Sequence, residues 1–551
     1  MAHTSLPLPH ELILLIAESA QDRHCLWALS LTCRELNTVI TPILYDTVVV
    51  NIRDDDTFVS PHVRCLVQNL DHPKRRLIRD LAVITGLREF EREVLPTDVS
   101  RAQTLIPHEP VDDSKDCNVM GEINQIIYCF LKALEPCQLR GFVWQTIIPM
   151  IPQTYNHLAE FQPALEHLRF YNIAMELGDL VPLSHFLRLK SLYWGMIDNL
   201  VAVGMLFDYL QTSPSSLRSL CIGATTFLVR RREKSRRTSP VPLTEWGGVE
   251  TAFSGKFELP GLVEYKSLTH PILLQKILPS KSSHITRLYL RDTSDASLEW
   301  GKLLFSFRGL VEIGILYYCV VPSVDMFCHH RDTLKVLSVR GCMASRRHRR
   351  YLWSVDELVR LGEECKKLSE LTVSNRYRVG LSLEGGLKLL EEALHLAPFF
   401  DNGERQQLVE FPIHVFTNLE FLYFSLQREG GHGTSDRDLE GAYTTLLGHE
   451  VERVLNTNQF DPAGIKLKIV CAEVGRVIQP LDRATRIYWR AVPPRQPNSL
   501  SIGLELVRRE EIVASHAGLR LRHFYPSIIF NEGLRTIVQA RHLPPLDDYS
   551  Q

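Results

Sequence analysis

Two short stretches carry residue types that could do chemistry. His330-Arg331-Asp332 matches the opening of the catalytic-loop signature of protein kinases, in which the aspartate serves as the base. Neither a D-F-G triplet nor a glycine-rich phosphate loop accompanies it, and Asp332 lies directly before an expected strand. Cys328, His329 and His330 are potential metal ligands, but three consecutive residues do not have the spacing of a zinc site without distant partners.

The remaining catalytic signatures are missing from the sequence. The chain contains no phosphate-binding Walker loop, no G-x-S-x-G nucleophile turn and no H-E-x-x-H metalloprotease motif. We therefore expect a protein that is not an enzyme and that needs no cofactor or metal.

Composition narrows the class further. The 551 residues carry a net charge of −2 with 45% apolar and 23% charged residues, which is typical of a globular protein and favours neither nucleic acid nor anionic membrane as a partner. The longest apolar candidate, Ile313 to Val321, has about half the length of a membrane span. The 12 cysteines include no C-x-x-C pair, so neither a disulfide framework nor a zinc site is expected. These features predict a cytoplasmic or nuclear location.

The first fifty residues predict three short helices and a strand. The expected helices span 9–19, 22–31 and 32–40, and the strand spans 44–50. Thr32 with Glu35 forms a capping-box pattern for the third helix, and Pro42 is expected to end it. The segment LILLIA, from Leu12 to Ala17, is apolar almost all round, although a helix on one core needs only an apolar stripe.

These residues resemble an F-box of the kind common in fungal proteins. The resemblance lies in Leu8-Pro9-x-Glu11-Leu12, in L-x-x-L-S-L-x-C-R ending at Arg34, and in the exit P-I-L-Y-D, and it covers about residues 6 to 50. Many F-boxes carry a tryptophan after the Cys-Arg pair, where this chain has Leu36. The resemblance implies docking on the Skp adaptor, which joins a cullin–RING ubiquitin ligase. The matching positions would form the interface: Leu8, Pro9, Leu12, Ile16, Leu29, Cys33 and Leu36.

Apolar periodicity alone leaves an alternative for this segment. The three helices could instead bury their apolar residues on the domain that follows them. A domain boundary is expected near residue 50 in either case.

The middle of the chain repeats the pattern L-x-x-L-x-L with β-prone residues at its end. It begins at residues 139, 165, 189, 217, 285, 310, 334, 368 and 419, with a weaker copy at 63. Several intervals are 24 to 28 residues, the range of leucine-rich repeats, and helical patterns such as 354–370 fill them. We expect residues 51–430 to form an irregular α/β solenoid similar to leucine-rich repeats, with parallel strands on the concave face and helices outside. A parallel α/β domain without solenoid curvature is the alternative.

Strand residues between the leucines would face the concave side of such a solenoid. Arginine and tyrosine are frequent there, and both are enriched in protein interfaces. The concave face is therefore a candidate surface for a target protein with an acidic or phosphorylated segment, although solvated strand positions without a partner fit the pattern equally. The residues are Arg169, Tyr171, Tyr193, Arg287, Tyr289, Arg291 and Arg340, with His167 and Tyr423 at equivalent positions.

Two further segments interrupt or follow the repeats. A basic run, Arg230 to Arg237, lies in an insertion near 229–245 that is expected to be disordered, and either a solvated loop or a nuclear import signal fits the run. Residues 431–551 form a C-terminal segment expected to extend or cap the solenoid. The resemblance to an F-box implies that the protein is the substrate-recognition subunit of an SCF-type ubiquitin ligase, and a repeat scaffold outside any ligase is the rival interpretation.

Overall fold

The computed structural model describes nineteen ranges of the chain and divides it into two compact units. Unit 1 contains the described elements up to residue 267, and unit 2 contains those from residue 285 on. The described residues are 12–14, 23–52, 73–85, 113–145, 149–170, 173, 179–196, 200–212, 214–224, 259–267, 284–291, 303–317, 321–341, 353–377, 411–428, 451, 466–476, 485–492 and 503–507.

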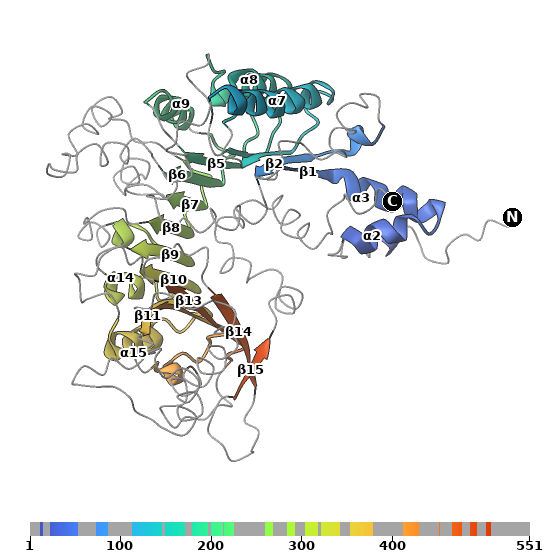
Figure 1. The fold of residues 1–551 in the computed structure, drawn as a ribbon. Coiled ribbons are helices and arrows are strands. Elements are labelled where there is room, and N and C mark those ends of the chain that lie inside the picture. The colour runs from blue at the N-terminus through green and yellow to red at the C-terminus, as the bar shows by residue number, and fades with distance from the viewer. Residues whose placement is uncertain are drawn as a thin grey trace. The chain divides into compact units, whose positions relative to one another are not determined.

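Unit 1 is a parallel sheet with helices on one face. Its strands are hydrogen-bonded in chain order: β1 (Thr47–Ile52), β2 (Asp80–Thr85), β3 (Gly141–Gln145), β4 (His167–Phe170), β5 (Ser191–Met196), β6 (Ser219–Ala224) and β7 (Glu264–Ser267). Helices α7 (Asp113–Lys132), α8 (Pro152–Phe161) and α9 (Leu200–Gln211) lie along one side of these strands (Figure 1). The helices α2 (Arg23–Ser30) and α3 (Arg34–Asp46) precede β1, and the short 3-10 helices are η1 (Pro73–Leu77) and η3 (Leu183–His185).

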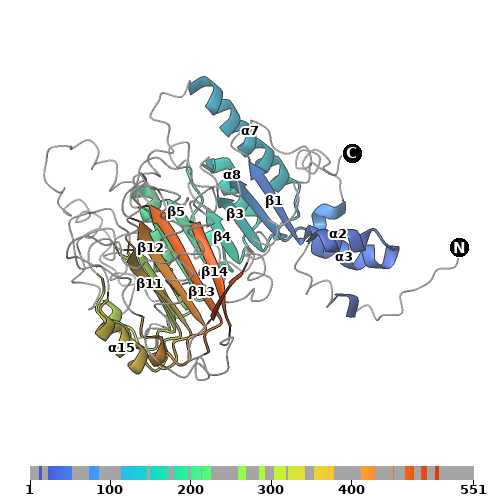
Figure 2. The same cartoon turned by 60° about the horizontal axis from the view of Figure 1, so that its bottom comes forward.

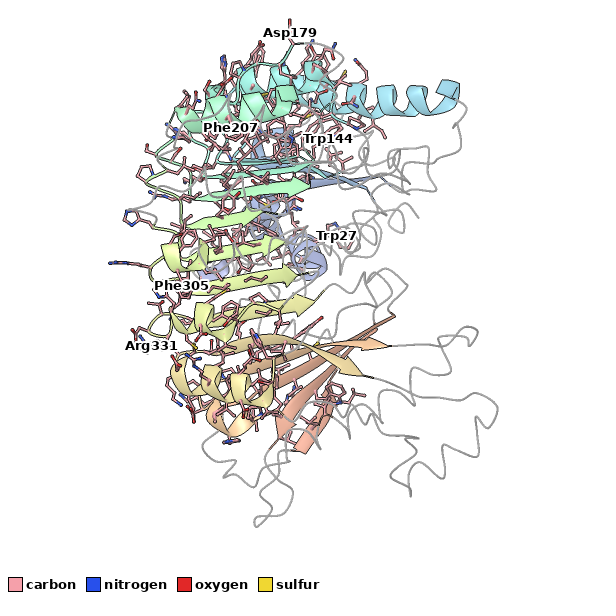
Figure 3. The ribbon with its side chains drawn as sticks, turned by 90° about the vertical axis from the view of Figure 1, so that its left-hand side faces the viewer. Trp27, Trp144, Asp179, Phe207, Phe305 and Arg331 are labelled. Atoms are coloured by element: carbon pink, nitrogen blue, oxygen red, sulfur yellow. The ribbon has the colours of Figure 1, made fainter. Side chains whose placement is uncertain are left out.

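The core of unit 1 lies between this sheet and its helices. Two parallel rows of buried apolar residues run across the strands, one through Leu168 and one through Phe170. The ring of Phe170 makes edge contacts with Tyr155 of α8 and with Trp194 of β5. The ring centres are 6.4 Å and 4.7 Å apart, respectively. Figure 3 shows Trp144, in the same row as Phe170, between the strands and the helices. Because side chains alternate along a strand, the residues between these rows face the opposite side of the sheet.

Unit 2 also has parallel strands that are hydrogen-bonded in chain order, and two antiparallel strands follow them. Its strands are β8 (Arg287–Arg291), β9 (Glu312–Tyr317), β10 (Val336–Gly341), β11 (Glu370–Tyr377), β12 (Phe421–Arg428), β13 (Ile469–Arg476), β14 (Thr485–Val492) and β15 (Gly503–Val507). Strands β8 to β13 are parallel, whereas β14 and β15 are antiparallel additions at the end. Figure 2 shows β11 to β14 as neighbours. The described helical elements of this unit include α14 (Val324–Cys328), α15 (Val355–Glu364) and η5 (Ile413–Val415).

The repeat pattern locates strands correctly. Each of the nine stronger L-x-x-L-x-L copies contains or leads into a strand, and the first two apolar positions of every copy are buried. The gap after residue 217 holds an additional strand, β7, in which Tyr265 occupies the position of a repeat leucine, in register with Leu220. After residue 368, β11 pairs directly with β12, so no further strand of this sheet lies between these two. The weaker copy at 63 and the basic run lie outside the described residues.

Amide side chains join successive turns of unit 1, and two of them, Gln162 and Asn124, are fully buried. Gln162 accepts a hydrogen bond from the backbone of Leu139 (2.9 Å) and donates one to Glu135 (2.8 Å). Asn124 and Asn156, on α7 and α8, hold the loops near 149–151 and 179–181 with the same paired geometry. Each amide satisfies one backbone donor and one acceptor that the turn would otherwise leave unpaired. The leucine pattern gave no indication of these residues.

The described chain is therefore an α/β protein whose strands are mostly parallel and alternate with helices, consistent with a solenoid similar to leucine-rich repeats. Strands β13 to β15 add to the sheet of unit 2. None of the helices in the described ranges has the length and apolarity needed to cross a membrane.

Candidate protein-interaction surfaces

Helices α2 and α3 pack on each other through a small apolar cluster. Leu26 and Ile40 are buried at its centre, and Leu36, Ile43 and Leu44 pack around them. The amide of Asn37 donates a hydrogen bond of 3.0 Å to the carbonyl of Ser30, so it fixes the start of α3 against the end of α2. Because the cluster is small, it buries only part of the apolar surface of these helices.

The start of α3 differs from the sequence prediction by one residue. Cys33, and not Thr32, is the N-cap, and its sulfur accepts a hydrogen bond from the backbone N–H of Leu36 at 3.5 Å. The Thr32 hydroxyl instead donates to the carbonyl of Leu29 at 2.7 Å, at the end of α2. The predicted capping box was therefore wrong, because the threonine closes the preceding helix.

The end of α3 also differs from the prediction. The helix continues through Pro42 to Asp46, and β1 begins at Thr47 rather than at Leu44. A proline inside a helix removes one backbone hydrogen bond and usually breaks or kinks the helix. Here the continued turn places Ile43 and Leu44 on the apolar cluster, and that burial offsets the lost bond.

Large apolar side chains are exposed in the N-terminal segment between residues 12 and 31. Nine exposed large apolar side chains occur among the described residues, and five of them lie between residues 12 and 31. Leu31 is 62% exposed, Leu12 46% and Trp27 42%, whereas Ile13, next to Leu12, is buried. Figure 3 labels Trp27 on α2. We name this set the N-terminal apolar patch: Leu12, Leu14, Trp27, Leu29 and Leu31.

The predicted adaptor-binding residues fall into three groups. Leu12 and Leu29 belong to the N-terminal apolar patch. Cys33 and Leu36 are half-buried, and both have structural roles, as the cap of α3 and as part of the cluster. The other three lie outside the described residues: Leu8, Pro9 and Ile16. Trp27 lies outside the quoted motif, whereas Leu31 belongs to the motif but was not among the predicted adaptor-binding residues.

The sheet face of unit 1 opposite the helices carries two rows of mainly polar residues. One row runs from His167 through Ser191 and Ser219 to Glu264. The parallel row contains Arg169, Tyr193, Cys221 and Lys266, in register on β4 to β7. Except for half-buried His167, every one of these residues is buried.

Arg169 and Tyr193 are the predicted target-binding residues in this face. The Arg169 guanidinium lies 3.9 Å from the centre of the Tyr193 ring, a cation–π contact, and Arg169 is only 1% exposed. This burial does not agree with an open target-binding surface at these two positions, because a target could reach them only after the face is uncovered. Alternation along the strand indicated correctly which side the residues face, but not that this side is covered.

Burial shifts the acid–base behaviour of the same face. The pKa of Lys266 is lowered to about 8, mainly because the buried ammonium loses water and also because of the positive charge of Arg169. Desolvation raises the pKa of Cys221 to about 11, which keeps this thiol protonated at neutral pH. A protonated, buried thiol is a poor nucleophile, so this cysteine is not suited to covalent chemistry.

The corresponding face of unit 2 is more open at its first strand. Arg287 and Tyr289, on β8, are both half-exposed. The Tyr289 hydroxyl donates a hydrogen bond of 2.7 Å to Glu312 on β9. Its ring lies where a side chain at position 314 would project, so Gly314 allows the tyrosine to lie across β9.

The other predicted target-binding residues are either buried or have side chains outside the described part of the chain. Tyr423 is fully buried in β12. The backbones of Arg291 and Arg340 lie in β8 and β10, but their side chains are outside the described part, as is the whole of Tyr171.

The kinase-like triplet has a structural role. His330 is buried and its Nε2 lies 3.2 Å from the carbonyl of Leu304, while Arg331 pairs with Glu364 at 3.8 Å. The carbonyl of Asp332 accepts a hydrogen bond from Lys367, so this residue contributes its backbone to the turn before β10. Within the described ranges, no three His, Cys, Asp or Glu side chains are grouped so that they could hold a metal ion.

Comparison with known proteins gives the chain no relative: no protein-family model matches it, and no curated protein matches it significantly.

Proposed function

We propose that this protein is the substrate-recognition subunit of an SCF-type ubiquitin ligase. Its N-terminal helices dock on the Skp adaptor, and its repeat units bind a protein to be ubiquitinated. It contributes no catalytic group: the transfer chemistry belongs to the other subunits, and this chain supplies proximity. It acts in the cytoplasm, the nucleus or both.

The observation that carries the proposal is the N-terminal apolar patch. Scattered exposed leucines are ordinary on a protein surface, whereas a concentration of them marks an interaction site. More than half of the exposed large apolar side chains in the described ranges lie within twenty residues, and Leu12 and Leu29 match F-box positions that contact the adaptor.

The energetics agree with a stable interface. Burying one leucine-sized side chain contributes roughly 1.5–3 kcal/mol. The five residues of the patch are 36% to 62% exposed, so burying their remaining surface supplies about 4 to 7 kcal/mol, of which association costs consume a large part. The remainder is compatible with a specific complex when further contacts, such as those of Leu8 and Pro9 in the motif, add to it.

Binding to the purified Skp adaptor tests the proposal. The double variant Leu12→Asp with Leu29→Asp places two carboxylates in the interface, and we expect affinity to fall at least about 100-fold. Leu187→Asp is the matched control, because Leu187 is 75% exposed in unit 1 but lies outside the patch, and it should bind like the wild type. Circular dichroism of all three proteins verifies folding.

The same experiment separates the rival interpretation. If the wild type does not bind the adaptor, or if the double variant binds equally well, the ligase function is wrong and a repeat scaffold outside the ligase remains. A complex that also retains a cullin–RING subunit through the adaptor would support the ligase assignment directly.

Within this function, the half-exposed residues of β8 are the better candidates for target contact. Arg287 can pair with a carboxylate or phosphate, and Tyr289 lies beside it on the same face. We expect Arg287→Glu to remove the target from the proteins captured with the chain, as measured by quantitative mass spectrometry. Arg308→Glu reverses an exposed charge elsewhere in unit 2 and is the control; equal capture by both variants would exclude this surface.

A further inference from the structure

Two buried cysteines meet where neighbouring helical elements of unit 2 end. Cys328 is the last residue of α14, and Cys365 is the C-cap of α15. Both are buried free thiols. The Cys365 thiol donates a hydrogen bond of 4.0 Å to the carbonyl of Phe327, the residue before Cys328. The two thiols are thus neighbours, although the residues belong to different turns of the chain, and they interact electrostatically.

The surrounding contacts hold the two helix ends in this position. Arg360 of α15 forms an ion pair of 2.6 Å with Asp325 of α14 and another of 2.8 Å with Glu364. The ring of Phe327 meets that of Trp353 edge-on at 5.6 Å. Because more than one contact holds these helix ends, the positions of the two thiols do not depend on a single exposed ion pair.

The environment also distinguishes the two sulfurs chemically. The interaction with the Cys365 thiol holds the pKa of Cys328 below its ordinary value, and the charge of Arg360 acts in the same direction. The same interaction, together with burial, raises the pKa of Cys365. Since the thiolate is the reactive form, Cys328 is the expected nucleophile and Cys365 the partner that resolves the product.

We propose that Cys328 and Cys365 form a redox pair, in which a hydroperoxide converts the two thiols into a reversible disulfide that joins α14 to α15. The Cys328 thiolate attacks one oxygen of hydrogen peroxide, the O–O bond breaks, and a sulfenic acid and hydroxide form. The Cys365 sulfur then attacks the sulfenic sulfur, the S–O bond breaks, and the S–S bond forms with release of water. Two thiols and one peroxide yield one disulfide and two water molecules.

The disulfide would change the behaviour of unit 2. It closes a loop that contains β10, and a cross-link of this kind stabilises the folded state mainly by restricting the unfolded chain. Oxidation would therefore stiffen the repeats on either side of β10, and thiol reductants would reverse the effect.

Differential alkylation tests the pair in the native full-length chain. The protein is treated with increasing concentrations of hydrogen peroxide, the remaining free thiols are blocked, and the peptides are identified by mass spectrometry. We expect a peptide pair linked through Cys328 and Cys365, lost on treatment with dithiothreitol. Exposed Cys137 is the internal reference for oxidant dose. The proposal is overturned if the pair stays reduced when Cys137 is fully oxidised, or if either cysteine links to a different partner.

A second measurement separates a disulfide from damage elsewhere. Hydrogen exchange of the α14 and α15 peptides, measured over a range of temperatures, gives the temperature at which unit 2 loses protection. Oxidation of the wild type should raise this temperature by about 5 °C. Cys328→Ser and Cys365→Ser should show no rise, whereas Cys137→Ser should respond like the wild type. If a serine variant does not fold, Cys328→Ala replaces it. A rise in the variants that lack the pair would contradict the proposal.

Discussion

The guanidinium of Arg169 lies 3.9 Å from the centre of the Tyr193 ring, and both side chains are buried on the sheet face that the helices of unit 1 leave free. The two residues are in register on β4 and β5, so the contact joins neighbouring strands. A buried arginine needs such contacts because desolvation of its charge is costly. In the folded chain the pair therefore stabilises unit 1.

Replacing Arg169 should destabilise unit 1. We expect Arg169→Ala to lower the free energy of unfolding by about 2–4 kcal/mol, because it removes the cation–π contact and leaves a gap beside the ring. Arg188→Ala, at an exposed position of the same unit, should change it by no more than about 0.5 kcal/mol. Urea unfolding monitored by hydrogen exchange in β4 and β5 measures both, and equal effects would contradict the assigned role.

Lys266 should make the stability of unit 1 depend on pH in the alkaline range. Its pKa is lowered to about 8 in the folded state, whereas an unfolded lysine titrates near 10.4. Between these values the unfolded chain binds more protons, so this residue makes stability rise with pH from about 8 to about 10.

The variant Lys266→Met isolates this contribution. We expect it to be more stable than the wild type by on the order of 2–3 kcal/mol at pH 7, because a neutral side chain avoids the desolvation penalty. The difference should shrink as pH rises toward 10. Urea unfolding of both proteins across this range is the measurement, and a constant difference would show that Lys266 titrates normally.

His330 should make unit 2 sensitive to acid. Its pKa is lowered to about 4, mainly by burial and also by the neighbouring His329, although the hydrogen bond to Leu304 opposes these effects. An unfolded histidine takes up its proton near pH 6.5, so the unfolded state binds more protons between about pH 6.5 and 4, and stability falls as the pH is lowered through that range.

His330→Gln tests this dependence while keeping a donor for the Leu304 carbonyl. Hydrogen exchange of the peptides around α14 should show the wild type losing protection from pH 6.5 to 4.5, and the variant losing less. Parallel losses in the two proteins would assign the acid sensitivity to other groups.

Part of this architecture follows directly from sequence. The repeated leucines predict strands because each strand buries two or three apolar positions against helices, and this requirement leaves a regular pattern. The leucine pattern did not locate strand β7, because Tyr265 fills the position of a leucine and tyrosine does not belong to the pattern. The helix 354–370 was predicted too long, since α15 ends at Glu364 and β11 starts at Glu370.

The N-terminal helices show a second limit. Pro42 was expected to end α3, and Thr32 was expected to cap it, because each rule is local. Packing on Leu26 and Ile40 extended the helix instead, and the Thr32 hydroxyl served the preceding helix. Tertiary contacts outweighed both local preferences.

The candidate surfaces show a third limit. Alternation along a strand assigns each side chain to a face, which is why Arg169 and Tyr289 were recognised as facing away from the helices. Whether such a face is covered depends on the rest of the chain, and the strand pattern does not contain that information. Arg169 is buried and Tyr289 is half-exposed, although they occupy equivalent positions.

Gly314 and Tyr289 should be energetically coupled. A methyl group at position 314 would overlap the Tyr289 ring, so Gly314→Ala should displace the ring, weaken its 2.7 Å hydrogen bond to Glu312 and lower the stability of unit 2 by about 1–3 kcal/mol. Tyr289→Ala alone should also destabilise unit 2, because it removes the ring and the hydrogen bond. In the double variant the added methyl group no longer meets a ring, so the glycine substitution should cost little or nothing there.

A double-mutant cycle by urea unfolding measures this coupling as the departure from additivity, expected to be at least about 1 kcal/mol. Gly204→Ala is the matched control, since a side chain there meets nothing within 4 Å and should be tolerated. Additive effects at positions 314 and 289 would mean that Gly314 is required for a reason other than the ring that lies over it. Coupling would instead establish that the tyrosine needs a residue without a side chain on the adjacent strand, and would explain its fixed orientation on the half-open face of β8.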